Sequence, residues 1–433
     1  MYVHSLFEVN RREILPLLLL GRHLREQGCR FELEPLKFAS NRLFSRPDER
    51  SVCLVPFHYT DSNIEFSLGC INWTGQAAID LCWEQMRNSW NREGLRPKGK
   101  MVEAGMIYTA WGRKFEAELL SAGVPRRQIR VTGNMRLDLP HHTNLLLSRE
   151  FLSKHYKLDS GKPWLLIPWN LHIASGRSSK FLLDTCRKAD LPFPELMVDI
   201  AQKSRDGFFD LMAKLPDAMP KSEIILRAHP SGDDVAMLRR HVGEKFSRIK
   251  VINDLDIMNW LVQSEVVIGW SSTALLEAIA ADVPSLCFEP VPYSKPLDYD
   301  VGRIAPLVTT VDEVLERVRQ SAPLRNGVDH GLFDQWYGKL DGGAHKRVAL
   351  VCREATEKID EYCIPSNVGR SRPKISPIRN AARRAILYSP HLSPTLRLLA
   401  HGRHYRDRRW LPRPRVEEVM DGAPVERLLR WIT

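Results

Sequence analysis

The sequence predicts a globular α/β protein of two domains, the second of which is built on a doubly wound parallel β-sheet. Its 433 residues are too many for one hydrophobic core of ordinary size and suit two domains of about 150 to 200 residues. With 43% hydrophobic and 27% charged residues, the chain can bury a sizeable interior. Strands alternate with helical segments over residues 164–289, which is typical of right-handed βαβ units on a parallel sheet.

The first predicted domain covers residues 1–160 and mixes helical with strand patterns. Apolar side chains recur at near-helical spacing from residue 14 to residue 24, and Gly28 suits the left-handed conformation that ends a helix. Short apolar runs predict strands, and Gly133-Asn134 predicts a turn. The predicted elements, in chain order, are helix 11–28, strands 30–33 and 51–59, helix 108–122, strand 128–132 and helix 145–156.

The second predicted domain covers residues 161–345 and alternates more regularly. It begins at the break Gly161-Lys162-Pro163, after which short apolar runs are separated by segments of helical period. The predicted elements are strand 164–168, helix 197–215, strand 223–228, helix 234–246, strand 250–253, helix 257–263, strand 265–270, helix 273–281, strand 285–289 and helix 311–320. A third region, residues 346–433, holds most of a closing helix over 344–362, a linker with Pro and Arg over 365–377, and a basic helical tail.

Almost all of the formal net charge of +11 lies near the C-terminus. Residues 366–433 contain 15 Lys and Arg against 5 acidic residues, so this tail carries +10. The charge pattern therefore does not suggest a nucleic-acid channel across the main body. Basic residues interleaved with Tyr405 and Trp410 suit an anionic membrane surface, where each Lys or Arg contributes roughly 1 kcal/mol. The alternatives are a solvated tail without a ligand and a nucleic-acid role, for which the tail carries no recognised binding motif.

The sequence shows no pattern for crossing a membrane. Its longest apolar runs, 14–20 and 164–169, fall short of the roughly 20 residues that span a bilayer. The N-terminus lacks the basic and apolar segments of a secretory signal, so we expect a cytoplasmic protein whose tail could hold it at the inner face of the membrane. The 8 cysteines include no C-x-x-C pair, which predicts reduced core residues and no metal site.

Two places in the second domain combine a strand end with polar residues. Ligands of open parallel sheets bind beyond the carboxyl ends of the strands. At the end of strand 223–228, in the string Arg227-Ala228-His229-Pro230, the proline stops the strand and would present His229 to the crevice. A histidine there could donate to a phosphate or transfer a proton.

The second place is the strand-to-helix turn that carries Ser271, Ser272 and Thr273. Unpaired backbone N–H groups and the helix dipole make such a turn an anion site, to which hydroxyl groups add donors, and a diphosphate would fit. The alternative is a serine that only caps the helix, worth about 1 kcal/mol. Glu277, further into the helix, could bind the hydroxyl pair of a ribose, or be an ordinary acidic residue near a helix start.

A set of short strings, in order over most of residues 1–320, carries a resemblance to a known family. The strings are E-V-N-R-R-E at 8–13, W-G at 111–112, G-V-P at 123–125, V-T-G-N at 131–134 with Arg136 and Asp138, W-N at 169–170, R-A-H-P at 227–230 and S-S-T-A-L-L-E at 271–277. With them the chain resembles the GT-B-fold group that includes bacterial capsule and surface-carbohydrate biosynthesis proteins. CDP-glycerol glycerophosphotransferases and capsule Kdo transferases are more distant relatives of that group.

The resemblance implies two Rossmann-like, doubly wound domains that face each other across a cleft. It implies transfer of a sugar or polyol phosphate from a nucleotide-activated donor to a surface-glycan or lipid-linked acceptor, with no cofactor and no metal. The C-terminal domain of such proteins holds the donor. On this analogy the donor-binding residues are Asn170, Arg227, His229, Pro230, Ser271, Ser272, Thr273 and Glu277.

A base that deprotonates the acceptor should come from the N-terminal domain, as a carboxylate or histidine within reach of the acceptor hydroxyl. The first candidates are Glu84 and His58, followed by Glu8 and Asp61. Two other functions stay open. The string Thr132-Gly133-Asn134 also suits a nucleotide-sugar 2-epimerase of the same fold. A non-catalytic scaffold, docked through residues 366–433 on a membrane polysaccharide-assembly complex, would account for the tail.

Overall fold

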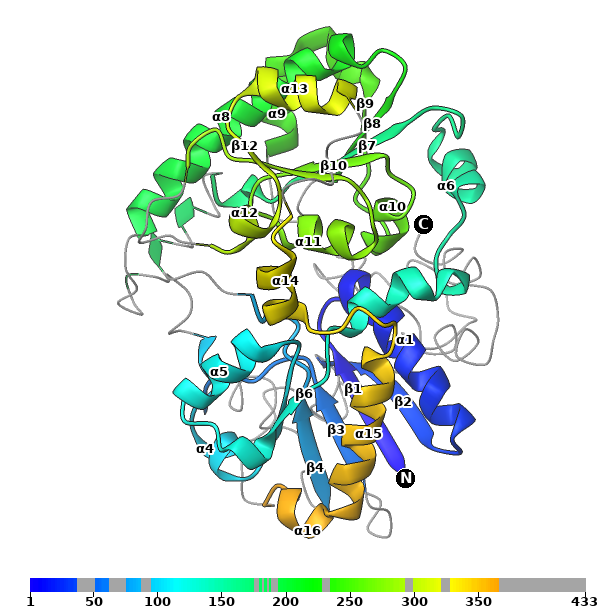
Figure 1. Cartoon of the computed structure of the whole chain (residues 1–433), viewed down its shortest axis with the longest axis vertical. Coiled ribbons are helices and arrows are strands. Elements are labelled where there is room, and N and C mark those ends of the chain that lie inside the picture. Colours follow the sequence, from blue (N-terminus) through cyan, green and yellow to red (C-terminus); the bar gives the residue numbers. More distant parts are fainter. Residues whose placement is uncertain are drawn as a thin grey trace, which may run out of the picture. The chain divides into compact units, whose positions relative to one another are not determined.

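The computed structural model forms two compact units, each built on its own six-stranded parallel sheet (Figure 1). The described residues are 1–36, 51–61, 75–86, 95–174, 179–180, 183–184, 187, 194–227, 234–292, 299–320 and 328–365. Among the described residues, the first unit takes those within 1–85, 95–145 and 335–365, and the second takes residue 86 and those within 146–334. His229, Pro230 and the basic tail 366–433 lie outside the described residues.

The sheet of the first unit has the order β2-β1-β3-β4-β5-β6, with every neighbouring pair parallel. Its strands are β1 (Tyr2–Phe7), β2 (Arg30–Pro35), β3 (Ser51–Val55), β4 (Gln76–Asp80), β5 (Ile107–Ala110) and β6 (Ile129–Val131). Every residue of β1, β3, β4 and β5 is buried, as expected for strands covered on both faces. The sequence pattern did not predict β1, which carries His4 and Ser5, or β4, which carries Gln76 and two alanines.

One predicted helix of the first unit begins later than expected. Residues 107–110, placed largely in helix 108–122 by the sequence pattern, form strand β5, and the helix starts only at Arg113. The reason lies in tertiary contacts. The backbone at Gly112 passes so close to the chain near Gln335 that a Cβ at 112 would lie 2.4 Å from the carbonyl oxygen of Gln335. The strand therefore ends in a bend that only glycine fits.

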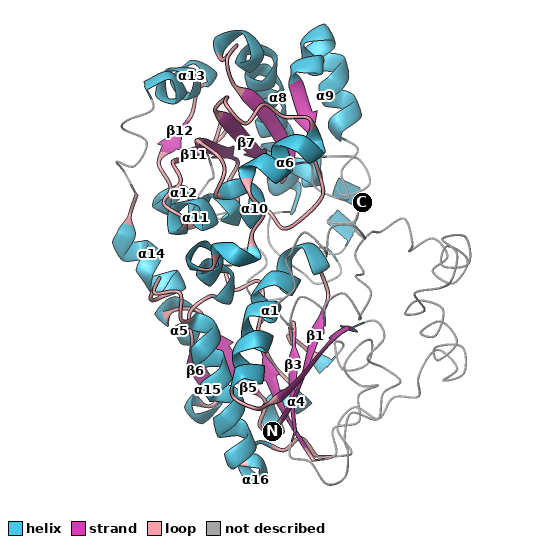
Figure 2. Ribbon diagram, turned by 90° about the vertical axis from the view of Figure 1, so that its right-hand side faces the viewer, coloured by secondary structure: helices cyan, strands magenta, loops and turns pink. Residues whose placement is uncertain are grey.

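The helices of the first unit are α1 (Asn10–Glu26), α4 (Lys100–Glu103), α5 (Arg113–Ser121), α15 (Ala344–Glu357) and α16 (Ile359–Tyr362). The long helix α1 ends as predicted, with Gly28 in the left-handed region at φ +75°. The predicted helix 344–362 is broken at Lys358 into α15 and α16. Helix α15 returns the chain to this unit and packs beside α1 (Figure 2).

The sheet of the second unit has the order β12-β11-β10-β7-β8-β9 and is also parallel throughout. Its strands are β7 (Trp164–Pro168), β8 (Glu223–Arg227), β9 (Ile249–Val251), β10 (Val266–Gly269), β11 (Ser285–Phe288) and β12 (Leu307–Val308). The first five agree with the predicted strands to within two residues at each end. The two-residue β12 was not predicted, because a strand that short has no measurable period.

Helices cover both faces of this second sheet. They are α6 (Arg149–Tyr156), α8 (Pro194–Ala218), α9 (Asp234–Val242), α10 (Met258–Leu261), α11 (Thr273–Ala280), α12 (Val301–Ile304), α13 (Val311–Gln320) and α14 (His330–Tyr337). Figures 1 and 2 show α8, α9 and α13 on one face and α10, α11 and α12 on the other. None of the helices in the described part of the chain is long and apolar enough to cross a membrane.

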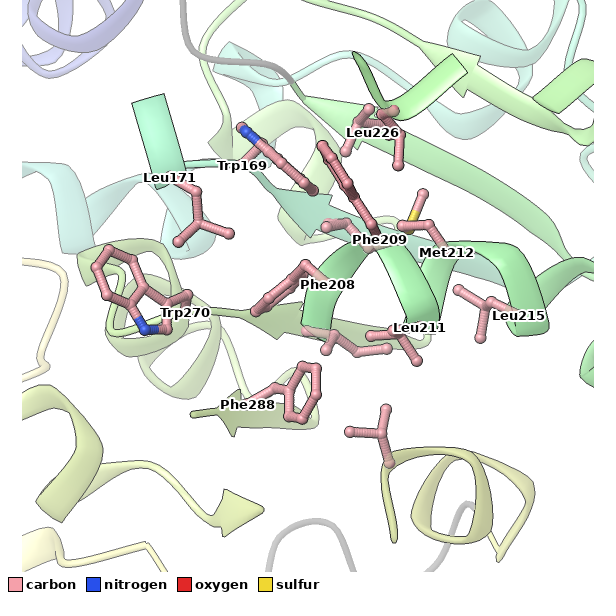
Figure 3. Close-up of a cluster of buried hydrophobic side chains, with 14 of the residues drawn as sticks. Trp169, Leu171, Phe208, Phe209, Leu211, Met212, Leu215, Leu226, Trp270 and Phe288 are labelled. Carbon is pink, nitrogen blue, oxygen red and sulfur yellow. The ribbon is translucent and has the colours of Figure 1, made fainter. Parts of the chain in front are cut away.

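An aromatic cluster joins α8 to the strands (Figure 3). Phe209 of α8 stacks on Trp169 with ring centroids 5.8 Å apart, and Phe208 of α8 meets Phe288 of β11 at 4.9 Å. Aromatic pairs of this kind add about 0.5 to 1.5 kcal/mol each beyond their area burial. Because Trp169 and Phe288 lie at the carboxyl ends of β7 and β11, this core holds the edge of the sheet at which polar residues gather.

The unit limits differ from the predicted domain limits at 160 and 345. The chain enters the second unit at residue 146, because α6 packs on that unit's core. The Tyr156 ring lies edge-on to Trp260 at 4.9 Å, and the Arg149 guanidinium lies 4.2 Å from the centre of the Trp164 ring. The chain returns to the first unit at residue 335, inside α14.

Asp138 holds the returning helix α15 to the first unit. Its buried carboxylate accepts the backbone N–H groups of Ala344 (3.1 Å) and His345 (2.7 Å), together with Nδ1 of His345 (2.8 Å). It therefore acts as an N-cap supplied from a distant part of the chain.

We expect Asp138→Ala to destabilise the first unit by about 2 to 4 kcal/mol, because a cap is lost and buried donors are left without a partner. The measurement is the midpoint of urea unfolding. The matched control is Asp341→Ala. Asp341 accepts from the backbone of Gly343 at 3.0 Å and pairs with Arg347 at 2.8 Å in an exposed position, so its loss should cost less than about 1 kcal/mol. Equal losses in the two variants would contradict this role for Asp138.

Candidate functional site

The carboxyl ends of four neighbouring strands form one edge of the second unit's sheet. The order β11-β10-β7-β8 places the residues that follow these strands next to one another. Trp169, directly after β7, donates its backbone N–H to the carbonyl of Arg227 at the end of β8 (2.9 Å). Asn170, Ser271 and Glu289 follow β7, β10 and β11 at the same edge. This is the edge at which open parallel sheets bind ligands.

The turn between β10 and α11 lies at this edge and contains backbone donors with no hydrogen bond among the described residues. Strand β10 ends at Gly269, Ser271 takes the left-handed conformation at φ +40°, and Ser272 caps α11 by accepting the N–H of Ala274 (3.3 Å). Within the described chain the backbone N–H groups of Ser272 and Thr273 make no hydrogen bond. Two free donors at the positive end of a helix dipole are suited to an anion.

The hydroxyl of Ser271 is already engaged. It donates to Oε1 of Glu289 at 2.5 Å, and both side chains are buried. The thiol of Cys287 lies 3.5 Å from the same oxygen, and burial raises its pKa well above the usual range, so it stays protonated. The hydroxyl proton of Ser271 is therefore not available to a phosphate, and the free donors of this turn belong to Ser272 and Thr273.

Arg227 binds backbone at the same edge. Its guanidinium donates to the carbonyl oxygens of Asp254 (2.5 Å) and Leu255 (2.9 Å), in the loop that follows β9. Leu255 has φ +69°, and Nε1 of Trp260 donates to the carbonyl of Asp254 at 3.2 Å. Arg227 thus fixes the shape of a neighbouring loop.

The other predicted donor residues differ in how far the structure describes them. Asn170 is half-buried, and its Oδ1 has no hydrogen-bond partner in the described part of the chain. Glu277 is buried, 8% exposed, in the second turn of α11. His229 and Pro230 follow β8 in sequence but lie outside the described residues. The turn, Asn170 and Arg227 are therefore brought to one edge, as the sequence predicted for strand ends.

In the first unit, Asp80 joins the loops after β3 and β4. Its Oδ2 accepts the backbone N–H of His58 (3.1 Å) and its Oδ1 that of Cys82 (2.8 Å). The His58 ring is fully buried, with Nδ1 2.9 Å from the hydroxyl of Tyr108. Burial lowers the pKa of His58 to about 4, so the imidazole is neutral near pH 7. Its Nε2 has no partner among the described residues.

Glu84 lies on the loop after β4, and its side chain is 57% exposed. Its Oε1 is 2.7 Å from Nη1 of Arg12, whose Nη2 is 3.6 Å from the carboxylate of Glu13. Glu13 is buried and accepts the backbone N–H groups of Glu8 (2.8 Å) and Val9 (3.2 Å). Burial raises the pKa of Glu13 to about 7, so near neutral pH it can hold or release a proton.

Sequence reasoning missed Glu13 and Glu289 as polar groups of these edges. A pattern in the sequence could have revealed Glu13, because it continues the buried helical series Leu17, Leu20 and Leu24, and an acid in such a series needs a partner. For Glu289 the only pattern is its place at the end of a predicted buried strand.

The two remaining base candidates, Asp61 and Glu8, lie at a helix start and on an exposed loop. Asp61 accepts the backbone N–H of Lys100 (2.8 Å) at the start of α4, where Gly99 at φ +92° leaves room for the carboxylate. Glu8 is exposed on the loop after β1. The structure therefore places Glu84 and Glu8 in the open, His58 in the interior, and Asp61 at a helix start.

Solved structures with the same fold include enzymes of more than one kind. A UDP-N-acetylglucosamine 2-epimerase from Listeria monocytogenes matches with a TM-score of 0.55 and 15% identity, covering 83% of this chain and 98% of that one. The UDP-GlcNAc 2-epimerase from Neisseria meningitidis, solved bound to UDP-GlcNAc, gives 0.52 and 12%, covering 82% and 100%. The wall teichoic acid polymerase TagF gives 0.53 and 9%, covering 83% and 90%.

The chain therefore has the GT-B-type fold of these structures, with two parallel six-stranded sheets, and the fold prediction is confirmed. Neither a family model nor a curated protein sequence matches this chain. At these low identities the likeness shows the fold, and the chemistry must be argued from the side chains.

The titration of His58 should be visible in stability. Its folded pKa of about 4 lies below the unfolded value, so the unfolded chain takes up the proton first as the pH falls. The contribution of neutral His58 to folding stability is fully present above about pH 6.5 and is lost as the pH falls to about 4. Between pH 7 and pH 5 we expect the free energy of unfolding of the unmodified protein to fall by about 2 kcal/mol more than that of His58→Gln. Urea unfolding at the two pH values measures this, with exposed His330→Gln as control. An unchanged slope in His58→Gln would refute it.

Proposed function

We propose that the chain is a transferase that moves a sugar or a polyol phosphate from a nucleotide-activated donor to a surface-glycan or lipid-linked acceptor. The observation that carries this proposal is the β10–α11 turn, which presents the free N–H groups of Ser272 and Thr273 at the ligand-binding edge of a parallel sheet. A diphosphate is the anion best suited to such a turn. The GT-B-type fold, shared with TagF and with an epimerase that binds UDP-GlcNAc, supports the same donor class.

In this proposal the donor lies on the second unit. Ser272 and Thr273 bind its phosphates, with His229 and Pro230 completing the phosphate site. Asn170 offers a hydroxyl or base edge its Oδ1, which has no partner among the described residues, and Arg227 shapes the neighbouring loop. Glu277 is buried on α11, and Ser271 precedes that helix. The helix dipole and basic groups would stabilise the leaving diphosphate, so the reaction would need no metal and no cofactor.

For the acceptor base we favour Glu84 over His58. A base must reach the acceptor hydroxyl, and Glu84 is 57% exposed whereas the His58 ring is fully buried. Arg12 bonds Glu84 and also faces Glu13, whose proton can leave near pH 7. When Glu13 is ionised, Arg12 is shared between two carboxylates and Glu84 becomes a better base.

A 2-epimerase is the second candidate, favoured by the epimerases among the matching structures. The two functions differ in what they need. An epimerase would convert UDP-GlcNAc to its C2 epimer without any acceptor, whereas a transferase would release nucleotide only when an acceptor is present. Incubation with UDP-GlcNAc alone, followed by chromatography of the sugar nucleotide, separates them.

The donor site is tested by binding of CMP, CDP, UDP and GDP to the purified protein. We expect at least one to bind, and His229→Ala to weaken its affinity about tenfold or more, since a charge-assisted contact to phosphate is lost. The matched control is His241→Ala, an exposed histidine on α9 in the same unit, which should bind as the unmodified protein does. No binding by any of the four nucleotides would end both enzyme proposals. Unchanged affinity in His229→Ala would remove His229 from the site.

We also propose that residues 366–433 hold the protein at an anionic membrane surface, which a non-catalytic scaffold would need as well. The net charge of +10 on residues 366–433 supports binding to such a surface. The full chain should sediment with vesicles that contain an anionic lipid and not with neutral ones, and about 0.5 M salt should release it. A chain ending at residue 365 is the control. Equal recovery of the two chains on anionic vesicles would rule out the membrane role.

A further inference from the structure

The conformation of the β10–α11 turn depends on a side chain that lies outside the sequence motifs described above. Ser271 is a non-glycine residue in the left-handed region, at φ +40°. This region is unfavourable for a residue with a Cβ, and the surrounding structure must compensate. The compensation in this turn is the 2.5 Å hydrogen bond from the Ser271 hydroxyl to Oε1 of Glu289. A hydrogen bond from a hydroxyl to a carboxylate is charge-assisted and is among the stronger hydrogen bonds in proteins.

The Glu289 carboxylate is itself confined by the elements around it. The backbone N–H of Glu289 donates to the carbonyl of Val308 in β12 (2.9 Å), which fixes where its side chain begins. The Cys287 thiol lies 3.5 Å from Oε1. On the α12 side, a Cβ at Gly302 would lie only 2.6 Å from Oε1, so the absence of a side chain at 302 makes room for the carboxylate. Strand β11 and helix α12 together hold Oε1 against Ser271.

This arrangement sets the direction of the donors that follow. If Ser271 moved to an ordinary negative φ, the peptide planes of Ser272 and Thr273 would rotate, and their N–H groups would leave the sheet edge. We propose that Glu289 is a positioning residue of the donor site. By holding Ser271 in the left-handed conformation, it aims the N–H groups of Ser272 and Thr273 at the donor phosphates. The inference rests on the proposed function and gives Glu289 no contact with the donor.

The test is a rescue experiment on nucleotide binding by the full chain. The probes are inorganic pyrophosphate and whichever of CMP, CDP, UDP and GDP binds the unmodified protein most tightly. Glu289→Ala should weaken binding about tenfold or more, because the turn relaxes. Glu289→Gln should cost no more than about threefold, since its amide oxygen still accepts from Ser271. Adding Ser271→Gly to Glu289→Ala should restore binding to within about threefold, because glycine adopts φ +40° without help.

Three further measurements complete the design. Cys287→Ala removes a neighbour of the carboxylate but leaves the bond to Ser271, so affinity should not change. Ser271→Ala keeps the Cβ and loses the bond, so it should match Glu289→Ala and replaces it if that variant does not fold. Amide hydrogen exchange over residues 270–276 should be faster in Glu289→Ala and return toward the original rate in the double variant.

Each outcome decides the proposal. Unchanged affinity and exchange in both Glu289→Ala and Ser271→Ala would overturn it. Loss of binding that Ser271→Gly does not rescue would also overturn it, and would point to a direct contact between Glu289 and the donor. If the unmodified protein binds none of the probes, the proposed function fails. The exchange rates of the turn in the single and double variants then decide by themselves whether Glu289 holds it.

Discussion

In a parallel sheet buried on both faces, polar side chains find partners or ligands most readily where the strands end, and both candidate edges of this molecule follow from that constraint. In the second unit the strands are mostly apolar and helices cover both faces of the sheet, whereas the strands of the first unit also bury His4, Ser5 and Gln76. Polar and charged groups within such layers would lose water without gaining partners. The residues with chemistry therefore gather at the carboxyl edges, which hold Ser271 and Asn170 in the second unit and His58 and Glu84 in the first.

Buried carboxylates hold both edges in shape. Asp80 and Glu13 accept backbone N–H groups of the loops after β1, β3 and β4, Asp138 caps the returning helix α15, and Glu289 fixes Ser271. A buried acid is costly unless its oxygens are satisfied, and these acids accept from backbone N–H groups or, in Glu289, from the hydroxyl of Ser271.

Because the fold is shared by different enzymes, the reaction depends on a few side chains at the sheet edges. The GT-B-type fold is shared with an epimerase and with a teichoic acid polymerase, so the fold by itself does not identify the reaction. In this chain the second unit offers free N–H donors, and the first offers an exposed acid, Glu84, bonded to Arg12 and near the titrating Glu13.

The sequence by itself determined the two-domain α/β class and five of the six strands of the second sheet, because short apolar runs separated by helical periods are local patterns. It also marked the turn at 271–273, since a hydroxyl run between a strand and a helix is local too. Strands β1 and β4 were not predicted, because their polar or small residues are buried only by residues that are distant in the sequence. The true start of α5 was not predicted, because the bend at Gly112 depends on the nearby backbone of Gln335, which is far away in the sequence.

Only the tertiary structure decided what each candidate side chain can do. His58 and Glu84 look alike as bases in the sequence, yet folding buries the first and lowers its pKa while leaving the second in the open. Ser271 and Ser272 are neighbours of one type, yet Glu289, 18 residues away, takes the hydroxyl of the first. Burial, pKa and hydrogen-bond partners come from residues far apart in the chain, so no local pattern contains them.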